Sequence, residues 1–232
     1  MKLKGARIFI SGGSSGIGKA TAALLAEAGA AIAISGRDPE KLNRVADELG
    51  VKAVHLDQGD YGDISEKFQS LIQQLGGLDV LINNAGIGVR AAMGDLTAEK
   101  FEQVFSVNVF GLALLTQEAV KTFKTQGYGH IVNIASTAAL KGYPTGTVYG
   151  ASKFALRGMT QCWQTELRKH NIRVMLVNPS EVPTAFAQEN RKPRPEEERK
   201  LTSLEIAHSI KAALEMDDRG FIPELTVWAT NP

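Results

Sequence analysis

The sequence predicts an α/β protein built on a doubly wound parallel sheet, with about seven strands and helices on both faces. Short apolar runs rich in β-branched residues alternate with stretches of helical periodicity. Strands that lack a polar face are typical of a parallel sheet covered on both sides. Right-handed crossovers between such strands give the doubly wound arrangement.

The expected elements alternate along the chain. The strands are expected at Ala6–Ile10, Ala30–Ser35, Lys52–Leu56, Leu78–Ile82, His130–Ile134, Arg173–Val177 and Glu224–Trp228. The helices are expected at Ile17–Ala28, Pro39–Leu49, Tyr61–Leu75, Ala98–Lys124, Val148–Lys169 and Leu204–Met216. Local signals agree with these ends. Asp38-Pro39 is an N-cap followed by proline at the first helical position, and Gly29 and Gly50 stand where the first two helices would end.

Composition indicates one soluble globular domain, which we expect to span residues 1–232. The chain is 44% apolar and 22% charged, and it shows neither an internal repeat nor an interdomain linker. A net charge of +1 gives no electrostatic reason to expect nucleic acid or an anionic membrane as a partner. The histidines show no metal-ligand spacing, so no metal site is expected.

The remaining signals favour the cytoplasm. A single cysteine, Cys162, cannot form an internal disulfide, which fits a reducing compartment. The first apolar run stops at Gly12, which is too short for the core of a signal peptide. No stretch approaches the roughly 20 apolar residues of a membrane span.

The segment Thr184–Lys200 departs from the alternating pattern. It is rich in charge, poor in apolar residues, and contains Pro193 and Pro195. It is either a solvated surface loop or a mobile lid over a substrate, because long connections beside a site are often lids.

A glycine-rich turn, Ser11-Gly-Gly-Ser-Ser-Gly-Ile-Gly18, joins the first strand to the first helix. Glycine tolerates positive φ and lets a backbone approach a pyrophosphate, and the helix N-terminus offers free N–H groups to the phosphates. Its spacing, G-x-x-x-G-x-G, differs from the G-x-G-x-x-G of the general dinucleotide fingerprint. The residues expected to contact the phosphates are Gly12, Ser14, Ser15, Gly16, Ile17 and Gly18.

The end of the second strand indicates which dinucleotide is bound. A protein that binds NAD usually places Asp or Glu here, on the ribose 2′-hydroxyl. This chain has Ser35-Gly36-Arg37 instead. Arg37 can hold the 2′-phosphate of NADP in forked hydrogen bonds, and Gly36 removes the carboxylate that would repel it. NADP(H) is therefore favoured over NAD(H). The alternative is a surface arginine that opens a helix.

Ser136, Tyr149 and Lys153 together describe a proton-transfer site. Tyr149 and Lys153 are four residues apart, so on a helix they share one face. Lowering a tyrosine pKa from about 10 to about 7 takes roughly 4 kcal/mol, which a cation about 4 Å away can supply at an effective dielectric near 20. Ser136 can donate a hydroxyl to a developing oxyanion. On an ordinary helix, however, the same spacing is often only a solvated pair.

With these motifs in order, the chain resembles the short-chain dehydrogenase/reductase family, including its 3-oxoacyl-carrier-protein reductase-like and carbonyl reductase-like members. The motifs are the glycine turn, Asn83-Asn-Ala-Gly86, Ser136, Tyr149-Gly-Ala-Ser-Lys153, and Asn178-Pro179 followed by Thr184. The resemblance implies a Rossmann-type oxidoreductase. It also implies that Asn108 is a fourth catalytic residue, which shapes a water relay to the lysine.

The resemblance further assigns the cofactor contacts. Asp57 and Gln58 would border the adenine, and Asn84, Ala85 and Gly86 would line the adenosine ribose. The main chain of Val182 and the hydroxyl of Thr184 would hold the nicotinamide carboxamide, while Tyr149 and Lys153 would lie against the nicotinamide and its ribose.

The reaction expected is NADP(H)-dependent interconversion of a ketone or aldehyde and an alcohol, with Tyr149 as general acid or base. Arg90 either faces a phosphopantetheine, which makes reduction of a 3-oxoacyl-carrier protein an alternative, or is an exposed arginine of a loop. A non-catalytic NADP-binding regulator is a second alternative. The helices expected at Ala98–Lys124 and Val148–Lys169 carry more apolar side chains than one sheet face needs. A homo-oligomer is therefore expected.

Overall fold

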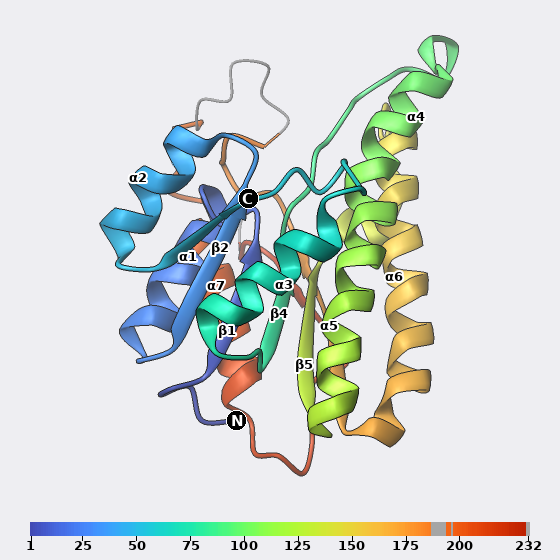
Figure 1. Ribbon diagram of the computed structural model, residues 1–232. Helices are drawn as coiled ribbons and strands as arrows, with labels where there is room; N and C mark the ends of the chain where they lie inside the picture. Colours follow the sequence, from blue (N-terminus) through green and yellow to red (C-terminus); the bar gives the residue numbers. More distant parts are fainter. Residues whose placement is uncertain (187–193, 196, 231–232) are drawn as a thin grey trace.

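The computed structural model describes residues 1–186, 194–195 and 197–230. Their strands form one parallel sheet in the order β3-β2-β1-β4-β5-β6-β7 (Figure 1). The strands are β1 (Arg7–Ser11), β2 (Ala31–Gly36), β3 (Lys52–His55), β4 (Val80–Asn83), β5 (Gly129–Ile134), β6 (Ile172–Pro179) and β7 (Glu224–Val227). The α-helices are α1 (Gly16–Glu27), α2 (Pro39–Leu49), α3 (Ile64–Leu75), α4 (Ala98–Phe105), α5 (Leu112–Gln126), α6 (Thr147–Leu167) and α7 (Ser203–Glu215). The predicted fold class is confirmed.

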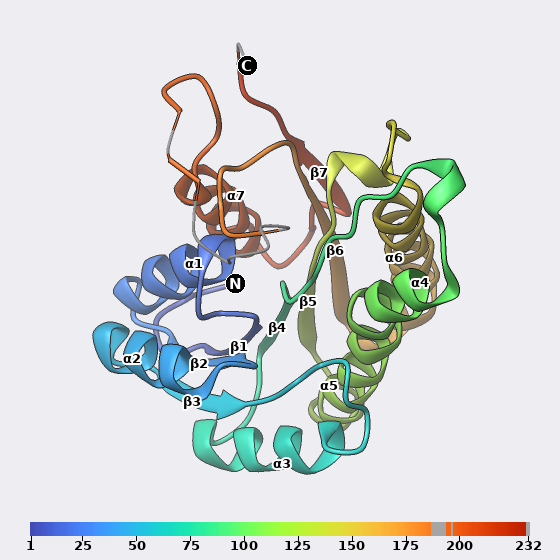
Figure 2. The same ribbon diagram turned by 90° about the horizontal axis from the view of Figure 1, so that it is seen from above.

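Helices cover both faces of the sheet, as the apolar strands predict (Figure 2). The alternation of side chains along β1 shows why both faces are apolar. Ile8 and Ile10 belong to the core layer beneath α1, α2 and α7, whereas Phe9 belongs to the layer beneath α3, α5 and α6. All three side chains are almost fully buried.

The helix expected at Ala98–Lys124 is interrupted by a π-helical turn, η2 (Ser106–Gly111), between α4 and α5. The turn packs against the chain that follows β3. A Cβ on Gly111 would overlap the carbonyl oxygen of Gln58, and Gln58 Nε2 donates to the carbonyl oxygen of Val107 at 2.9 Å. Single π-helical turns are frequent at functional sites, and this one contains Asn108.

The third helix starts at Ile64 rather than at Tyr61, because side chains capture the preceding backbone. The N–H of Gly59 donates to Asp57 Oδ1 at 2.9 Å, and that of Gly62 donates to Asp60 Oδ1 at 3.2 Å. Such local bonds compete with helix formation.

Two other predictions concern the segment Thr184–Lys200 and membrane-spanning helices. Of the lid or surface loop expected at Thr184–Lys200, residues 187–193 and 196 lie outside the described residues. Its described parts include Arg194 and Lys200, which form ion pairs with Glu181 at 2.6 and 3.4 Å. No helix in the described ranges is long and apolar enough to cross a membrane.

Candidate active site

The predicted site residues gather at the carboxyl edge of the sheet. The strand order reverses direction between β1 and β4, and in doubly wound folds ligands bind in the crevice at such a point. The glycine turn follows β1, Asn84 to Gly86 follow β4, and Ser136 follows β5. Parallel strands therefore bring motifs that are distant in the sequence to one place.

The glycine turn can only be built from glycine at its main positions. Gly12 and Gly16 have φ of 67° and 53°, in the left-handed region that favours glycine. A Cβ on Gly12 would lie 2.8 Å from Ala85 Cα, and one on Gly18 would lie 2.5 Å from the Gly12 carbonyl oxygen. The turn thus packs tightly against the residues that follow β4.

The start of α1 has the features of an anion site. Ser15 is its N-cap, yet the hydroxyl makes no capping hydrogen bond, and the first turn carries no acidic residue. The first N–H groups of a helix lack intrahelical partners and carry partial positive charge. The glycine turn and the start of α1 form a cradle of N–H groups, and this cradle fits the pyrophosphate of a dinucleotide.

Two side chains fix the cradle to the end of β4. Asn84 Nδ2 donates to the carbonyl oxygens of Ser11 and Gly12 at 3.1 and 2.9 Å. Ser11 Oγ accepts from the N–H groups of Asn84 and Ala85 at 3.2 and 3.1 Å. The side chain of Asn84 therefore holds the turn, a role that the sequence reasoning did not assign to it.

Arg37 stands at the end of β2, exposed, and beside the cradle. Within the described ranges its guanidinium makes no hydrogen bond or ion pair, whereas its carbonyl oxygen accepts from His55 Nε2 at 3.0 Å. Gly36 lies against Ser14, since a Cβ on Gly36 would be 3.0 Å from Ser14 Oγ. The guanidinium is thus available to a ligand at this edge.

The residues expected at the adenine lie after β3 and differ in exposure. Asp57 is half-buried and accepts from the N–H of Gly59. Gln58 is 3% exposed, and its side chain reaches inward to η2. The side chain of Gln58 therefore supports the turn that carries Asn108.

Tyr149, Ser136 and Lys153 are brought together by α6 and the end of β5. Lys153 Nζ lies 5.7 Å from the centre of the Tyr149 ring and donates to the carbonyl oxygen of Ile134 at 2.8 Å. Ser136 caps the short 3-10 helix η3 (Thr137–Ala139), and its Oγ accepts from the N–H of Ala138 at 3.1 Å. The ring of Phe186 packs on that of Tyr149, with 5.4 Å between the ring centres.

The pKa of the Tyr149 phenol differs from the sequence-based expectation. Burial raises it above its ordinary value, and a hydrogen bond with Ser136 lowers it only in part. Burial also lowers the pKa of Lys153 to about 8. The lowering expected from Lys153 is not seen; burial of the phenol is the largest effect on this pKa, and the ammonium donates to the Ile134 carbonyl oxygen. The phenol therefore carries its proton at neutral pH.

Asn108 is fully buried and joins the loop after β4 to α6. Its Nδ2 donates to the Ile87 carbonyl oxygen at 2.9 Å and to Ser152 Oγ at 3.0 Å, and its Oδ1 accepts from the Ile87 N–H at 2.9 Å. Ser152 Oγ donates in turn to the Tyr149 carbonyl oxygen at 2.7 Å. Sequence reasoning missed this link, although Ser152 lies inside the Tyr149–Lys153 motif.

Two further predicted contacts lie where the loop after β6 returns to the cradle. A Cβ on Gly16 would be 3.3 Å from Thr184 Cγ2, so Thr184 lies over the start of α1. Its Oγ1 accepts from the N–H of Phe186 at 3.2 Å. Val182 is half-buried and packs on the core layer beneath α1.

A buried ladder of polar side chains lies below the site, and sequence reasoning missed it. Asn83 Nδ2 donates to Thr116 Oγ1 at 2.8 Å and to Asn133 Oδ1 at 2.9 Å, and Asn133 Nδ2 donates to Thr160 Oγ1 at 2.8 Å. All four residues are at most 2% exposed. The ladder ties α5 and α6 to the adjacent strands β4 and β5.

The sequence comparison decides the family. A family model described as short chain dehydrogenase matches residues 6–195. The chain belongs to this family. The match confirms the resemblance that the motifs and their order predicted. The protein is an oxidoreductase.

Several known proteins are similar to this chain over nearly its whole length. An uncharacterized oxidoreductase of Staphylococcus aureus is 33% identical over 221 residues, which cover 94% of each chain. An alcohol dehydrogenase from Thermococcus sibiricus, complexed with 5-hydroxy-NADP, has a TM-score of 0.90 at 27% identity and covers 98% of this chain and 97% of its own. A 3-ketoacyl-(acyl-carrier-protein) reductase from Brucella melitensis, complexed with NADH, has a TM-score of 0.88 at 27% identity, covering 98% of each.

Proposed function

We propose that the protein interconverts a ketone or aldehyde and an alcohol with NADP(H) as the hydride carrier. One observation carries this proposal: Ser136, Tyr149, Lys153 and Asn108 lie together near the glycine turn at the start of α1. A proton-transfer group next to a nicotinamide site is what reversible carbonyl reduction requires.

The preference for NADP(H) over NAD(H) is supported by the edge of the cradle. Arg37 is exposed there, and Gly36 stands where a carboxylate would repel a 2′-phosphate. The Thermococcus sibiricus enzyme was solved with 5-hydroxy-NADP, whereas the Brucella melitensis enzyme was solved with NADH. The cofactor preference therefore rests on this chain's own residues.

When bound, the cofactor supplies or accepts the hydride. Ser136 orients and polarises the substrate carbonyl, and Tyr149 donates the proton in reduction or accepts it in oxidation. The phenol carries its proton at neutral pH, as a proton donor in reduction must. Lys153 holds the nicotinamide ribose. Asn108 fixes the water that resupplies the proton.

The remaining cofactor contacts follow the same proposal. The turn from Gly12 to Gly18 holds the pyrophosphate, and the residues after β3 and β4 border the adenosine. Thr184, which lies over the start of α1, holds the nicotinamide carboxamide together with the main chain of Val182.

The substrate is proposed to be an uncharged carbonyl compound with an apolar body. The ring of Phe186 packs on the Tyr149 ring, and the ring of Tyr143 lies so close to Gly146 that a Cβ there would collide with it. The rings of Phe186 and Tyr143 thus offer apolar contacts near the phenol.

Reduction of a 3-oxoacyl-carrier protein is a second candidate, favoured by the position of Arg90. Arg90 is exposed in the loop after β4, and its charge lowers the pKa of Tyr143, which burial raises. A cation at this rim could bind the phosphate of a phosphopantetheine arm.

The first experiment is a screen of ketones, aldehydes and a 3-oxoacyl thioester with NADPH or NADH, together with alcohols and NADP⁺. We expect carbonyl-dependent oxidation of NADPH that is faster than that of NADH at equal, subsaturating concentrations. Tight NADPH binding without turnover of any compound would support a non-catalytic NADP-binding regulator instead.

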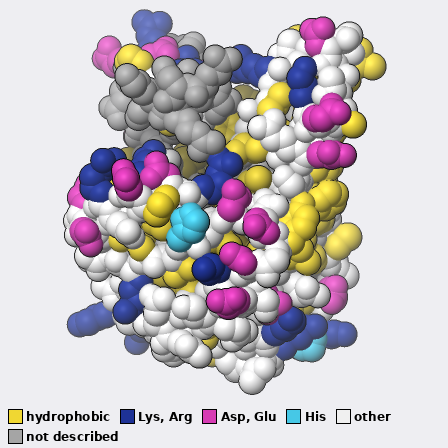
Figure 3. Space-filling view, turned by 45° about the horizontal axis from the view of Figure 1, so that its top comes forward, with side chains coloured by type: hydrophobic (Ala, Val, Ile, Leu, Met, Phe, Trp, Pro, Cys, Tyr) yellow, Lys and Arg dark blue, Asp and Glu magenta, His cyan; other side chains and the backbone are white. Residues whose placement is uncertain are grey.

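We further propose that the protein is a cytoplasmic homo-oligomer that assembles through α4, α5 and α6. Along these helices Val109 and Leu112 are buried, whereas Phe154 is 46% exposed. Phe110 and Leu114 are exposed as well. Figure 3 shows hydrophobic side chains gathered on the side of the molecule where Figure 1 places these helices. A second copy of the chain, presenting the same helices, would cover them.

Light scattering of the purified protein at micromolar concentration should give the mass of at least a dimer. Phe110→Glu should shift the mass toward that of the monomer, because it places a charge in the apolar surface. Leu204→Glu is the matched control. Leu204 is 48% exposed but lies on α7, so the mass of this variant in solution should stay that of the wild type. A wild-type protein that is monomeric at this concentration would contradict the proposal.

A further inference from the structure

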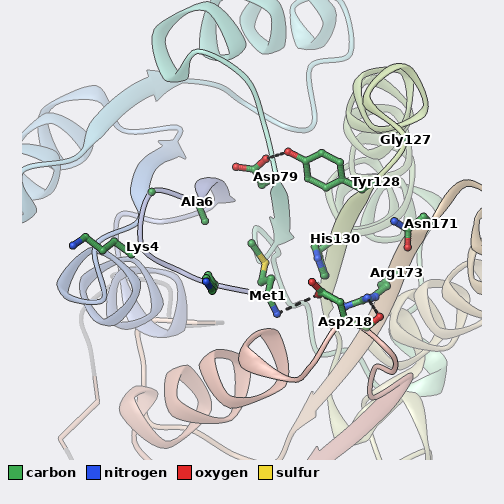
Figure 4. Close-up of a pocket in the computed structure, with 12 residues that line it drawn as sticks. Met1, Lys4, Ala6, Asp79, Gly127, Tyr128, His130, Asn171, Arg173 and Asp218 are labelled. Atoms are coloured by element: carbon green, nitrogen blue, oxygen red, sulfur yellow. Dashed lines mark hydrogen bonds and ion pairs between the residues drawn. The ribbon is translucent and has the colours of Figure 1, made fainter.

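Charged side chains at the two ends of the sheet differ in whether they have partners. A hollow of about 630 Å³ lies at the amino ends of the strands (Figure 4). Its carboxylates are paired, because Tyr128 donates to Asp79 at 2.6 Å and Arg173 donates to Asp218 at 3.0 Å. At the carboxyl ends, the guanidinium of Arg37 makes no hydrogen bond or ion pair within the described part of the chain. Binding of a ligand by Arg37 therefore depends on how the main chain of this residue is held.

His55, the last residue of β3, lies beside the turn from β2 to α2. It is paired with Gly36 in the parallel register of the two strands, one residue before Arg37. Val54 packs in the core layer beneath α3, α5 and α6, whereas Ala53 packs against the layer beneath α1, α2 and α7. Side chains alternate along a strand, so His55 shares the face of Ala53. This is the face on which the chain leaves β2 for α2.

The imidazole of His55 reaches the main chain of Arg37. Its Nε2 lies 3.0 Å from the Arg37 carbonyl oxygen. A carbonyl oxygen only accepts, so Nε2 carries a proton and donates it to this bond. The neutral ring in this tautomer and the protonated ring both have that donor. The contact therefore joins β3 to Arg37 in either charge state of the ring.

Contacts of the main chain also fix the backbone on both sides of Arg37. The N–H of Leu56 donates to the Gly36 carbonyl oxygen at 3.3 Å, and the Asp38 carboxylate accepts from an N–H of the first turn of α2 at 3.0 Å. Between these two points, His55 holds the carbonyl of Arg37 itself. A backbone that is already fixed loses less entropy when its side chain binds a ligand. The turn is thus preorganised for the guanidinium that it carries.

We propose that His55 is a positioning residue for cofactor selection, which holds the main chain of Arg37 so that the guanidinium meets the 2′-phosphate of NADP(H). This inference rests on the proposed function, in which Arg37 binds that phosphate. NADH lacks the 2′-phosphate, so His55 contributes to the affinity for NADPH and not to the affinity for NADH. Because His55 acts through Arg37, the effects of replacing the two residues are coupled.

Fluorescence titrations of the whole chain with NADPH and with NADH test this role. His55→Leu keeps a side chain of similar size but removes the donor. It should weaken NADPH binding about two- to tenfold, as loss of one hydrogen bond does, and leave NADH binding unchanged. His55→Gln places an amide donor near the position of Nε2 and should bind NADPH more tightly than His55→Leu. His208→Leu is the matched control, because this exposed histidine lies on α7, and it should affect neither cofactor.

A double-mutant cycle with Arg37→Ala separates positioning from other roles of the imidazole. In the Arg37→Ala background, His55→Leu should weaken NADPH binding no further. An equal loss in both backgrounds would show that His55 acts without Arg37, and an equal loss of NADPH and NADH would show that it supports the adenosine site as a whole. Either result overturns the inference, and so does an unchanged NADPH affinity in His55→Leu.

The same titrations distinguish failure of this inference from failure of the proposed function. If Arg37→Ala weakens NADPH binding selectively while His55→Leu has no effect, only the role of His55 is rejected. If Arg37→Ala leaves NADPH affinity unchanged, the NADP(H) assignment is rejected together with it.

Discussion

Replacing Tyr149 with phenylalanine should abolish turnover and leave NADPH binding nearly unchanged. The ring still packs on Phe186, and only the transferable proton is lost. Steady-state kinetics with the best carbonyl substrate, together with a fluorescence titration of NADPH, measures both quantities. A variant that kept more than about a tenth of the wild-type kcat would limit the contribution of this residue to less than about 1.4 kcal/mol.

The matched control for this substitution is Tyr61→Phe, which removes the same hydroxyl from a tyrosine that is 41% exposed after β3. It should leave kcat within error of the wild type. Lys153→Ala should reduce both turnover and cofactor affinity, since this lysine is proposed to serve the ribose as well as the phenol. Loss of turnover in Tyr61→Phe would mean that the assay reports stability rather than proton transfer.

Replacing Arg37 with alanine should weaken NADPH binding by roughly 10- to 150-fold, because a charge-assisted hydrogen bond contributes about 1.5–3 kcal/mol. NADH lacks the 2′-phosphate, so its affinity should barely change. Arg44→Ala, which removes an exposed arginine from α2, is the matched control and should affect neither cofactor. Paired titrations of both cofactors measure the effect.

Adding Gly36→Asp to Arg37→Ala should reverse the cofactor preference. The carboxylate repels a 2′-phosphate and accepts from the ribose hydroxyl of NADH. A Cβ at this position meets Ser14 Oγ at 3.0 Å, and this short side chain can rotate away. Equal loss of both cofactors in Arg37→Ala would show that Arg37 supports the loop. A wild-type preference for NADH would reject the NADP(H) assignment.

The sequence was sufficient to predict the fold because each strand and helix carries its own local signal. Apolar strands such as β1 contribute to both core layers, and Gly50 ends α2 in the left-handed conformation that its position predicts. The glycine turn could also be predicted from the sequence, since only glycine tolerates both the positive φ and the close contact of Gly12 with Ala85.

The parts that sequence reasoning missed depend on contacts between distant segments. The π-helical turn at Asn108 packs against Gln58, which is far away in the sequence, so helical periodicity over residues 98–124 cannot reveal it. The pKa of Tyr149 is raised by burial of the phenol, and the Lys153 ammonium points to the Ile134 carbonyl oxygen. Spacing along one helix contains neither quantity.

The buried ladder of Asn83, Thr116, Asn133 and Thr160 has a consequence for how the protein opens. Pulling α6 from the sheet would strand the amide of Asn133 in an apolar interior, at a cost of about 1–3 kcal/mol for each unsatisfied group. Partial opening between β5 and α6 is therefore disfavoured relative to opening of the whole unit. The amide hydrogens of β4, β5, α5 and α6 should therefore exchange with solvent cooperatively. These four elements, which lie below Tyr149, behave as one foldon.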